Sequence, residues 1–177
     1  AFVVFALCSW VICSQAFSNS GGSFQVQKHK NTVGMRASAV RYEGDVAAVR
    51  TLYWFRKALR LHDNPSLHAA SIGTSTIDHI FCLDPWFVSS GKVGVNRLGF
   101  LLESLQDLHQ SLTNVGSRLI IVHGNPLEEI PRICKEWGIT RIYFESDTED
   151  YARHRDAALL SWAAGHGVEA VRVCGHT

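Results

Sequence analysis

From about residue 51 onward, short apolar runs alternate with segments whose apolar residues recur at helical spacing. The runs are expected at 51–55, 77–83, 118–122, 141–145 and 168–173. They are β-branched or aromatic and apolar at both odd and even positions, which is typical of strands covered on both faces. Because helical crossovers return the chain between parallel strands, this alternation predicts an α/β fold with a doubly wound, five-stranded parallel sheet.

Three segments between these runs carry strong helix signals. The first has one apolar stripe, expected to begin near Asn96 and Arg97 and formed by Leu98, Leu101, Leu102, Leu105, Leu108 and Leu112. The second starts with Asn125 as cap and Pro126 as first residue, ends at Gly138, and is expected to bury Leu127, Ile130, Ile133, Cys134 and Trp137. The third is expected from about 148 to 164, burying Tyr151, Ala158, Leu159 and Trp162 and stopping at Gly165.

The composition favours a globular domain and excludes several kinds of site. A chain of 177 residues with 46% hydrophobic residues favours about one domain. The formal net charge is +1 and there is no Lys/Arg block, so no dedicated nucleic-acid surface is expected. The five cysteines are widely spaced without a C-x-x-C pair, which predicts buried free thiols. The nine histidines show no metal-ligand spacing.

The first fifty residues differ from the rest of the chain. Residues 2–13 form an apolar run that is short for a bilayer span, and Ser14-Gln-Ala16 then offers a small-x-small pattern suited to signal peptidase. From 17 to 42 the chain is basic and rich in hydroxyl groups, with no acidic residue. This order resembles the bipartite presequence of algae with plastids of eukaryotic origin, in which Phe17 would follow the cleavage site. We therefore expect a signal-peptide-like segment at 1–16, a transit-peptide-like or disordered extension at 17–49, and plastid localisation.

Under this targeting hypothesis the natural protein begins upstream of Ala1, where the given sequence starts. Two alternatives stay open. In the first, Met35, the single methionine, is the true start, and the protein then lies in the nucleus or cytoplasm. In the second, residues 2–13 form an internal core helix. No membrane attachment is expected in the mature form.

Ligands of open α/β sheets bind beyond the carboxyl ends of the strands, where the winding reverses. The loops expected there are 55–63, 84–93, 123–125 and 146–150, and none contains a G-x-G-x-x-G or P-loop pattern for phosphate. Arg56 follows the first strand. Its guanidinium either contacts an anionic or carbonyl-rich ligand or braces the loop by pairing with Asp63 or Asp147.

Other polar and aromatic residues near these loops have simpler interpretations. Asp63-Asn64-Pro65 predicts a helix start with Asn64 as the cap. Trp86 and Phe87 either stack on a ring system or pack between elements. Arg155 and Asp156 are expected to make local salt links. No nucleophile–base pair, paired catalytic carboxylates or metal cluster can be assembled, so this segment alone is not expected to catalyse a reaction.

Several motifs, in order, resemble the photolyase/cryptochrome family. The opening motif consists of Trp54, Phe55, Arg56, Leu59, Arg60, Asp63, Asn64 and Pro65. The resemblance continues through Asp84-Pro-Trp-Phe87, Gly94-Val-Asn-Arg97, and Asp147-Thr-Glu-Asp-Tyr151 with Arg155-Asp156. It implies a Rossmann-like N-terminal α/β domain over residues 50–177. The motifs look most like the branch of animal-type cryptochromes and (6-4) photolyases, whose helical FAD domain is not in this sequence.

The resemblance also implies a place for an antenna chromophore, at candidate residues Phe55, Arg56, Asp147 and Glu149. Relatives with a deazaflavin antenna have an Asp in the segment matching 147–151, so the Asp147 carboxylate is expected either to bond to a chromophore ring or only to cap the last helix. Asp150 stands where many relatives have Pro, which leaves Asp147 untouched. Folate-antenna relatives carry an Asn-Glu pair where this chain has Tyr151-Ala152, so deazaflavin is favoured over folate.

The resemblance leaves two outputs for the full-length protein. One is light-driven repair of ultraviolet lesions in DNA by FAD bound outside this chain, and the other is blue-light signalling through protein partners without repair. Their expected partners are the helical domain and then damaged DNA or signalling proteins. A third hypothesis is a stand-alone pigment- or nucleotide-binding module, against which the missing phosphate loop counts.

Overall fold

The computed structural model describes residues 48–88 and 93–174. Its sheet consists of β1 (Arg50–Phe55), β2 (Thr76–Leu83), β3 (Leu119–His123), β4 (Arg141–Glu145) and β5 (Glu169–Val173). All neighbouring strands are parallel, in the order β3-β2-β1-β4-β5. The predicted fold class is therefore confirmed. The targeting hypotheses, Met35, Cys8 and Cys13 concern residues outside the described ranges.

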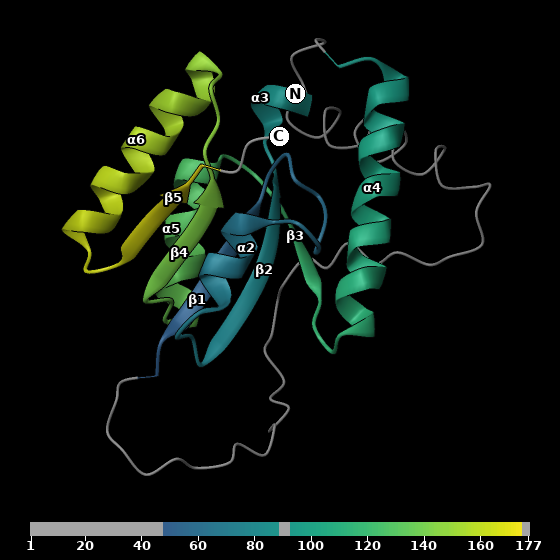
Figure 1. Cartoon of the computed structure of the whole chain (residues 1–177). Coiled ribbons are helices and arrows are strands. Elements are labelled where there is room, and N and C mark those ends of the chain that lie inside the picture. Colours follow the sequence, from purple (N-terminus) through teal and green to yellow (C-terminus); the bar gives the residue numbers. More distant parts are fainter. Residues whose placement is uncertain (1–47, 89–92, 175–177) are drawn as a thin grey trace. The chain divides into compact units, whose positions relative to one another are not determined.

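The order of the strands places the reversal of winding between β1 and β4. The chain passes from β1 to β2 and β3 on one side, then crosses back so that β4 pairs with the other side of β1. Helices α2 (Pro65–Ser71) and α4 (Val95–Asn114) cover one face, and α5 (Pro126–Trp137) and α6 (Asp150–Gly165) cover the other (Figure 1). The carboxyl ends of β1 and β4 therefore form the switch point, and in sheets of this kind the crevice at the switch point is where ligands bind.

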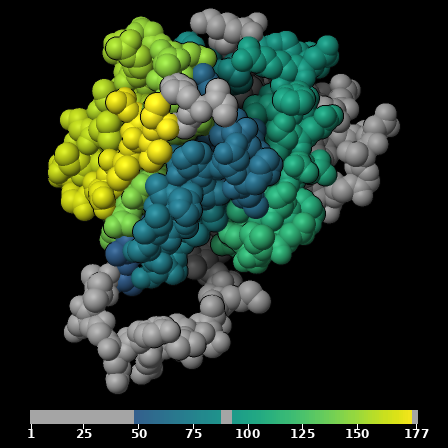
Figure 2. Space-filling model, in the orientation of Figure 1, coloured from purple at the N-terminus to yellow at the C-terminus, as the bar shows by residue number. Residues whose placement is uncertain are grey.

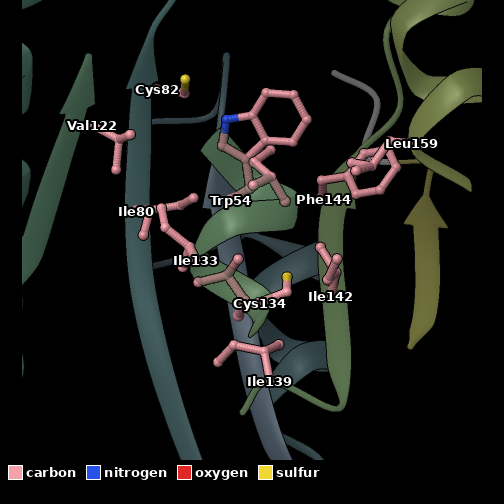
Figure 3. Packing of buried hydrophobic residues seen from close by; sticks show 12 residues of the cluster. Trp54, Ile80, Cys82, Val122, Ile133, Cys134, Ile139, Ile142, Phe144 and Leu159 are labelled. Carbon is pink, nitrogen blue, oxygen red and sulfur yellow. The ribbon is translucent and has the colours of Figure 1, made fainter. Parts of the chain in front are cut away.

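Alternate residues of the central strand β1 belong to two separate hydrophobic cores. Tyr53 and Phe55 pack with residues of α2 and α4, whereas Leu52 and Trp54 pack with residues of α5 and α6. Figure 3 shows the second core, with Trp54 near Cys82 and Phe144. In the space-filling view, the blue atoms of the segment that includes α2 lie beside the teal atoms of α4 (Figure 2). Helices on both faces of the sheet thus explain why the odd and the even positions of the strands are both apolar.

Local capping signals determine where two helices begin and where one ends. The Asn64 side chain accepts a 3.0 Å hydrogen bond from the Leu67 amide at the start of α2. The Asn125 side chain does the same for Leu127 at the start of α5. Gly138 ends α5 in the left-handed region with φ of 64°, a conformation that glycine adopts without a steric penalty. These three predictions are confirmed.

Several finer predictions about burial were wrong. Leu127 is 38% exposed because it lies in the first turn of α5, and Ala158 and Cys174 are exposed too. Helix α6 begins at Asp150 rather than near 148, and its buried face consists of Ala152, Asp156, Leu159 and Ala163. A charged residue at the centre of this face obscured its apolar pattern. A short helix, α3 (Pro85–Val88), was not expected at all.

Candidate functional site

The first side chain of the site is Arg56, which directly follows β1. Its Nη1 donates hydrogen bonds to the Glu145 carbonyl oxygen at 2.9 Å and to the Asp156 carboxylate at 2.8 Å. Its guanidinium carbon lies 4.9 Å from the centre of the Trp54 ring, within cation–π range. The side chain is 6% exposed, so a buried cation lies at the carboxyl end of β1.

The second guanidinium nitrogen of Arg56 is only weakly engaged. Nη2 lies 3.6 Å from the Asp147 carboxylate, which is too long for a hydrogen bond, and it has no hydrogen-bond partner although it is buried. Burial, and then the charge of Arg155, lower the pKa of Arg56. The expected bracing by Asp147 is present as an ion contact. Bracing by Asp63 was the wrong alternative, because Asp63 pairs with Arg60 instead.

Asp147 lies beyond the end of β4, opposite Arg56. Its Oδ1 accepts hydrogen bonds from Lys57 Nζ at 2.8 Å and from the Glu149 amide at 3.1 Å, whereas Oδ2 has only the long contact with Arg56. Burial would raise the pKa of Asp147, but Lys57, the Glu149 amide and Arg56 together hold it below its usual value. The residue is not the N-cap of α6, because Glu149 occupies that position. The N-cap interpretation is therefore wrong.

The other two candidate residues differ sharply in exposure. Glu149 is 64% exposed and pairs with Lys57 at 3.2 Å on the rim of the crevice. Phe55 is 1% exposed, with its ring 4.7 Å from that of Tyr53 in the core. Its side chain is thus turned away from a ligand in the crevice. Arg56, Lys57, Asp147 and Glu149 are the residues brought together there.

Asp156 is a residue of the site that sequence reasoning assigned only to local salt links. Its carboxylate is fully buried and contacts two guanidinium groups, Arg56 at 2.8 Å and Arg155 at 3.4 Å. The contact with Arg155 is the expected local link, but the stronger partner lies 100 residues away in the sequence. Its position in the sequence could have indicated burial, because Asp156 lies four residues after Ala152 and three before Leu159, on the same buried face of the helix.

The end of β2 and the first turn of α6 are joined by a polar and aromatic contact. The Tyr151 hydroxyl donates a 2.6 Å hydrogen bond to Asp84 Oδ2, and the Trp86 amide donates to Oδ1 of the same carboxylate at 2.9 Å. The ring of Trp86 stacks on that of Tyr151, with centres 4.0 Å apart and planes 8° from parallel. Burial, and then the bond to Asp84, raise the pKa of Tyr151 to about 12. Trp86 therefore packs between elements while remaining 43% exposed.

Comparison with known proteins identifies the family. The family model for DNA photolyase matches residues 51–177. The chain belongs to the photolyase/cryptochrome family. Cryptochrome-2 of Gallus gallus is 50% identical over 128 residues, covering 72% of this chain and 22% of the relative, and cryptochrome-1 of Mus musculus is 45% identical over 129 residues, covering 73% and 21%. The chain thus spans about a fifth of the length of these relatives.

Solved structures of the photolyase/cryptochrome family have the same fold. A cryptochrome from Synechocystis sp. PCC6803 superposes with a TM-score of 0.65 at 34% identity, covering 72% of this chain and 28% of that one. A class III photolyase from Agrobacterium tumefaciens superposes with a TM-score of 0.67 at 23% identity, covering 75% and 27%, which supports the fold alone. The chain therefore has the fold of the N-terminal α/β domain of this family.

Members of the photolyase/cryptochrome family typically bind FAD. Within the described residues, no three His, Cys, Asp or Glu side chains are placed to hold a metal ion. No described helix has the length and apolarity needed to cross a bilayer. A hollow of about 630 Å³ lies beside α2, lined by Leu61, Pro65 and His68 among others, and does not include Arg56 or Asp147. At the carboxyl ends of β1 and β4, by contrast, buried and oriented charged groups converge, as they commonly do at functional sites.

Proposed function

We propose that this domain holds a light-absorbing pigment in the crevice between β1 and β4, as the antenna-type part of a longer flavoprotein. The observation that carries the proposal is the buried Nη2 of Arg56, which has no hydrogen-bond partner and faces Oδ2 of Asp147 across 3.6 Å. Buried donors are almost always satisfied, and an unsatisfied one is destabilising. A ligand atom that accepts from Nη2 would remove this penalty.

The free hydrogen-bonding capacity favours a particular ring edge. Arg56 offers a donor and Asp147 Oδ2 offers an acceptor beside it, so a planar ring with adjacent C=O and N–H groups is complementary to both. Lys57 and Glu149 lie at the rim and would face the exposed part of the pigment. A deazaflavin has such an edge and is our preferred pigment over a folate. When bound, the pigment would absorb near-ultraviolet or blue light and pass the excitation to FAD.

For the full-length protein, we propose repair of ultraviolet lesions in DNA as the first candidate output. It requires FAD and damaged DNA, both bound by the helical domain found in relatives. Blue-light signalling through protein partners is the second candidate. It is favoured by the name cryptochrome carried by relatives that are 43–50% identical to this chain.

Pigment binding is tested with the Asp147→Ala variant of the full-length protein, purified from a host that makes deazaflavin. We expect the near-ultraviolet absorbance that copurifies with the wild type to disappear. Glu136→Gln on α5, which alters an exposed ion pair with Arg132, is the matched control and should keep the pigment. Full pigment occupancy in Asp147→Ala would refute the proposed site.

The output is tested separately on the full-length wild type. Blue light should restore normal bases in an oligonucleotide that carries a (6-4) photoproduct or a cyclobutane dimer, if the protein repairs DNA. No repair of either lesion, together with light-dependent capture of a protein partner, would favour signalling and reject the first candidate.

A further inference from the structure

The carboxylate of Asp147 is shared between two cations that follow β1. Its Oδ1 accepts a 2.8 Å hydrogen bond from Lys57 Nζ, whereas its Oδ2 lies 3.6 Å from Arg56 Nη2. The Lys57 side chain is 59% exposed and the Arg56 side chain only 6%. The carboxylate therefore has an outer partner at hydrogen-bond distance and an inner partner just beyond that distance.

We infer that Lys57 is a positioning residue for the ligand of this site. Its bond to Asp147 holds the carboxylate back from Arg56, so that Nη2 and Oδ2 both stay available to one ring edge. Lys57 thus acts through Asp147. The inference rests on the proposed function, because it concerns the same donor and acceptor.

The separation of Arg56 from Asp147 needs a cause, because opposite charges attract. A hydrogen bond between a guanidinium and a carboxylate is usually about 2.7–2.9 Å long, which is shorter than the contact seen here. Nη2 is also buried without a hydrogen-bond partner, and such a donor is destabilising until it is satisfied. Lys57 makes the shortest contact with the Asp147 carboxylate and is therefore the group that competes with Arg56 for it.

Glu149 keeps Lys57 and Asp147 in this arrangement. Its Oε1 accepts a second hydrogen bond from Lys57 Nζ at 3.2 Å, and its amide donates to Asp147 Oδ1 at 3.1 Å. The bond to Asp147 raises the pKa of Lys57, so the ammonium group is charged at neutral pH. If Lys57 is removed, the amide remains as one anchor on Oδ1, about which the carboxylate can pivot towards Arg56.

A closed pair of Arg56 and Asp147 would have little to offer a ligand. Its donor and acceptor would satisfy each other, so a ring edge could bind only by breaking a buried, charge-assisted hydrogen bond. Lys57 is therefore expected to increase affinity for the ring edge even though neither Nη2 nor Oδ2 belongs to it.

The first test measures the binding of 5-deazariboflavin to the pigment-free full-length protein by equilibrium dialysis. We expect Lys57→Met to bind this probe about tenfold more weakly than the wild type, because the probe must displace one charge-assisted hydrogen bond. Lys57→Arg keeps a cation that can donate to Asp147 Oδ1 and should restore most of the affinity. Lys135→Met removes an exposed lysine of α5, and this matched control should bind like the wild type.

Stability and structure separate positioning from a merely structural role. Because Lys57 is mostly exposed, loss of its ion pairs should lower the melting temperature of Lys57→Met by no more than about 4 °C. A crystal structure of this variant should show Arg56 Nη2 within about 3.2 Å of Asp147 Oδ2. That distance is measured without pigment, so it tests the role of Lys57 even if the domain binds none.

The inference is overturned if Lys57→Met binds the probe as tightly as the wild type. It is equally overturned if the crystal structure keeps Nη2 and Oδ2 more than about 3.5 Å apart, since Lys57 would then not be what separates them. Failure of the wild type to bind the probe would instead count against the proposed function, and the distance in Lys57→Met would still decide the role of Lys57.

Discussion

Removal of the Asp156 carboxylate should destabilise the domain more than loss of any exposed charge. This side chain is fully buried and accepts from Arg56 Nη1 at 2.8 Å. In Asp156→Ala, Arg56 keeps its bond to the Glu145 carbonyl but loses its closest counter-charge, and Arg155 loses its local partner as well. Since Arg56 is 6% exposed, water cannot replace the lost carboxylate without movement of the loop.

Breaking one partner of a buried ion pair typically costs about 3–5 kcal/mol, because the other charge stays buried without compensation. For a domain of this size, about 1 kcal/mol shifts the melting temperature by about 4 °C. The expected decrease for Asp156→Ala is therefore about 12–20 °C. Asp156→Asn keeps the shape and one acceptor oxygen, so it should cost less than Asp156→Ala but still more than 1 kcal/mol, or about 4 °C.

The assay is urea and thermal unfolding of the full chain, followed by circular dichroism. Glu149→Gln serves as the control, because it removes a carboxylate that is 64% exposed on the rim of the same site. Exposed ion pairs contribute about 0–1 kcal/mol and are screened by salt, so the control should be near neutral and salt-sensitive. A loss below about 1 kcal/mol for Asp156→Ala would refute the reasoning that the ion pair is buried and integral to the fold.

Three further predictions concern protonation, thiol reactivity and targeting. Burial lowers the pKa of His79 from 6.5 to about 4, against the opposing charge of Asp78. The neutral buried His79 therefore contributes fully to stability above pH 6.5, and up to about 3 kcal/mol is lost as the pH falls towards 4. Urea unfolding at several pH values should show this loss, and His79→Gln should reduce it. Burial raises the pKa of Cys82 to about 12 whereas Cys174 is exposed, so iodoacetamide should label Cys174 faster than Cys82, and equal rates for these two by peptide mass spectrometry would contradict the structure. Residues 1–50, given an upstream Met and fused to a fluorescent protein, should reach the plastid of an algal host, and cytosolic or nuclear fluorescence would reject the targeting hypothesis.

The elements of the fold could be predicted because their signals are local. The Asn64 cap, the Asn125–Pro126 helix start and the left-handed Gly138 each depend on residues within one helical turn. The strands are apolar at odd and even positions alike because helices cover both faces of a doubly wound sheet. The sequence was therefore sufficient for the fold class and for strand bounds within one residue.

The candidate site was predicted less completely, because its parts come from distant segments. The loops after β1 and β4 were expected to contribute, and the structure places Arg56 and Asp147 side by side there, since parallel strands end at the same edge of a sheet. The pairing of Arg56 with Asp156 was missed because a charged residue on a helix is normally exposed. Trp86 and Tyr151 lie in different motifs of the sequence, and no local pattern indicates that their rings stack.

The sequence by itself determined the parallel α/β class, the helix ends and the family motifs, all of which depend on short-range spacing. Only the tertiary structure decided that β4 lies beside β1, that Arg56 reaches Asp156 across 100 residues, and that the Tyr151 ring stacks on Trp86. The physical reason is that an ion pair or a stacked ring depends on the separation of its partners in space. That separation exists only once the strands have assembled in their order.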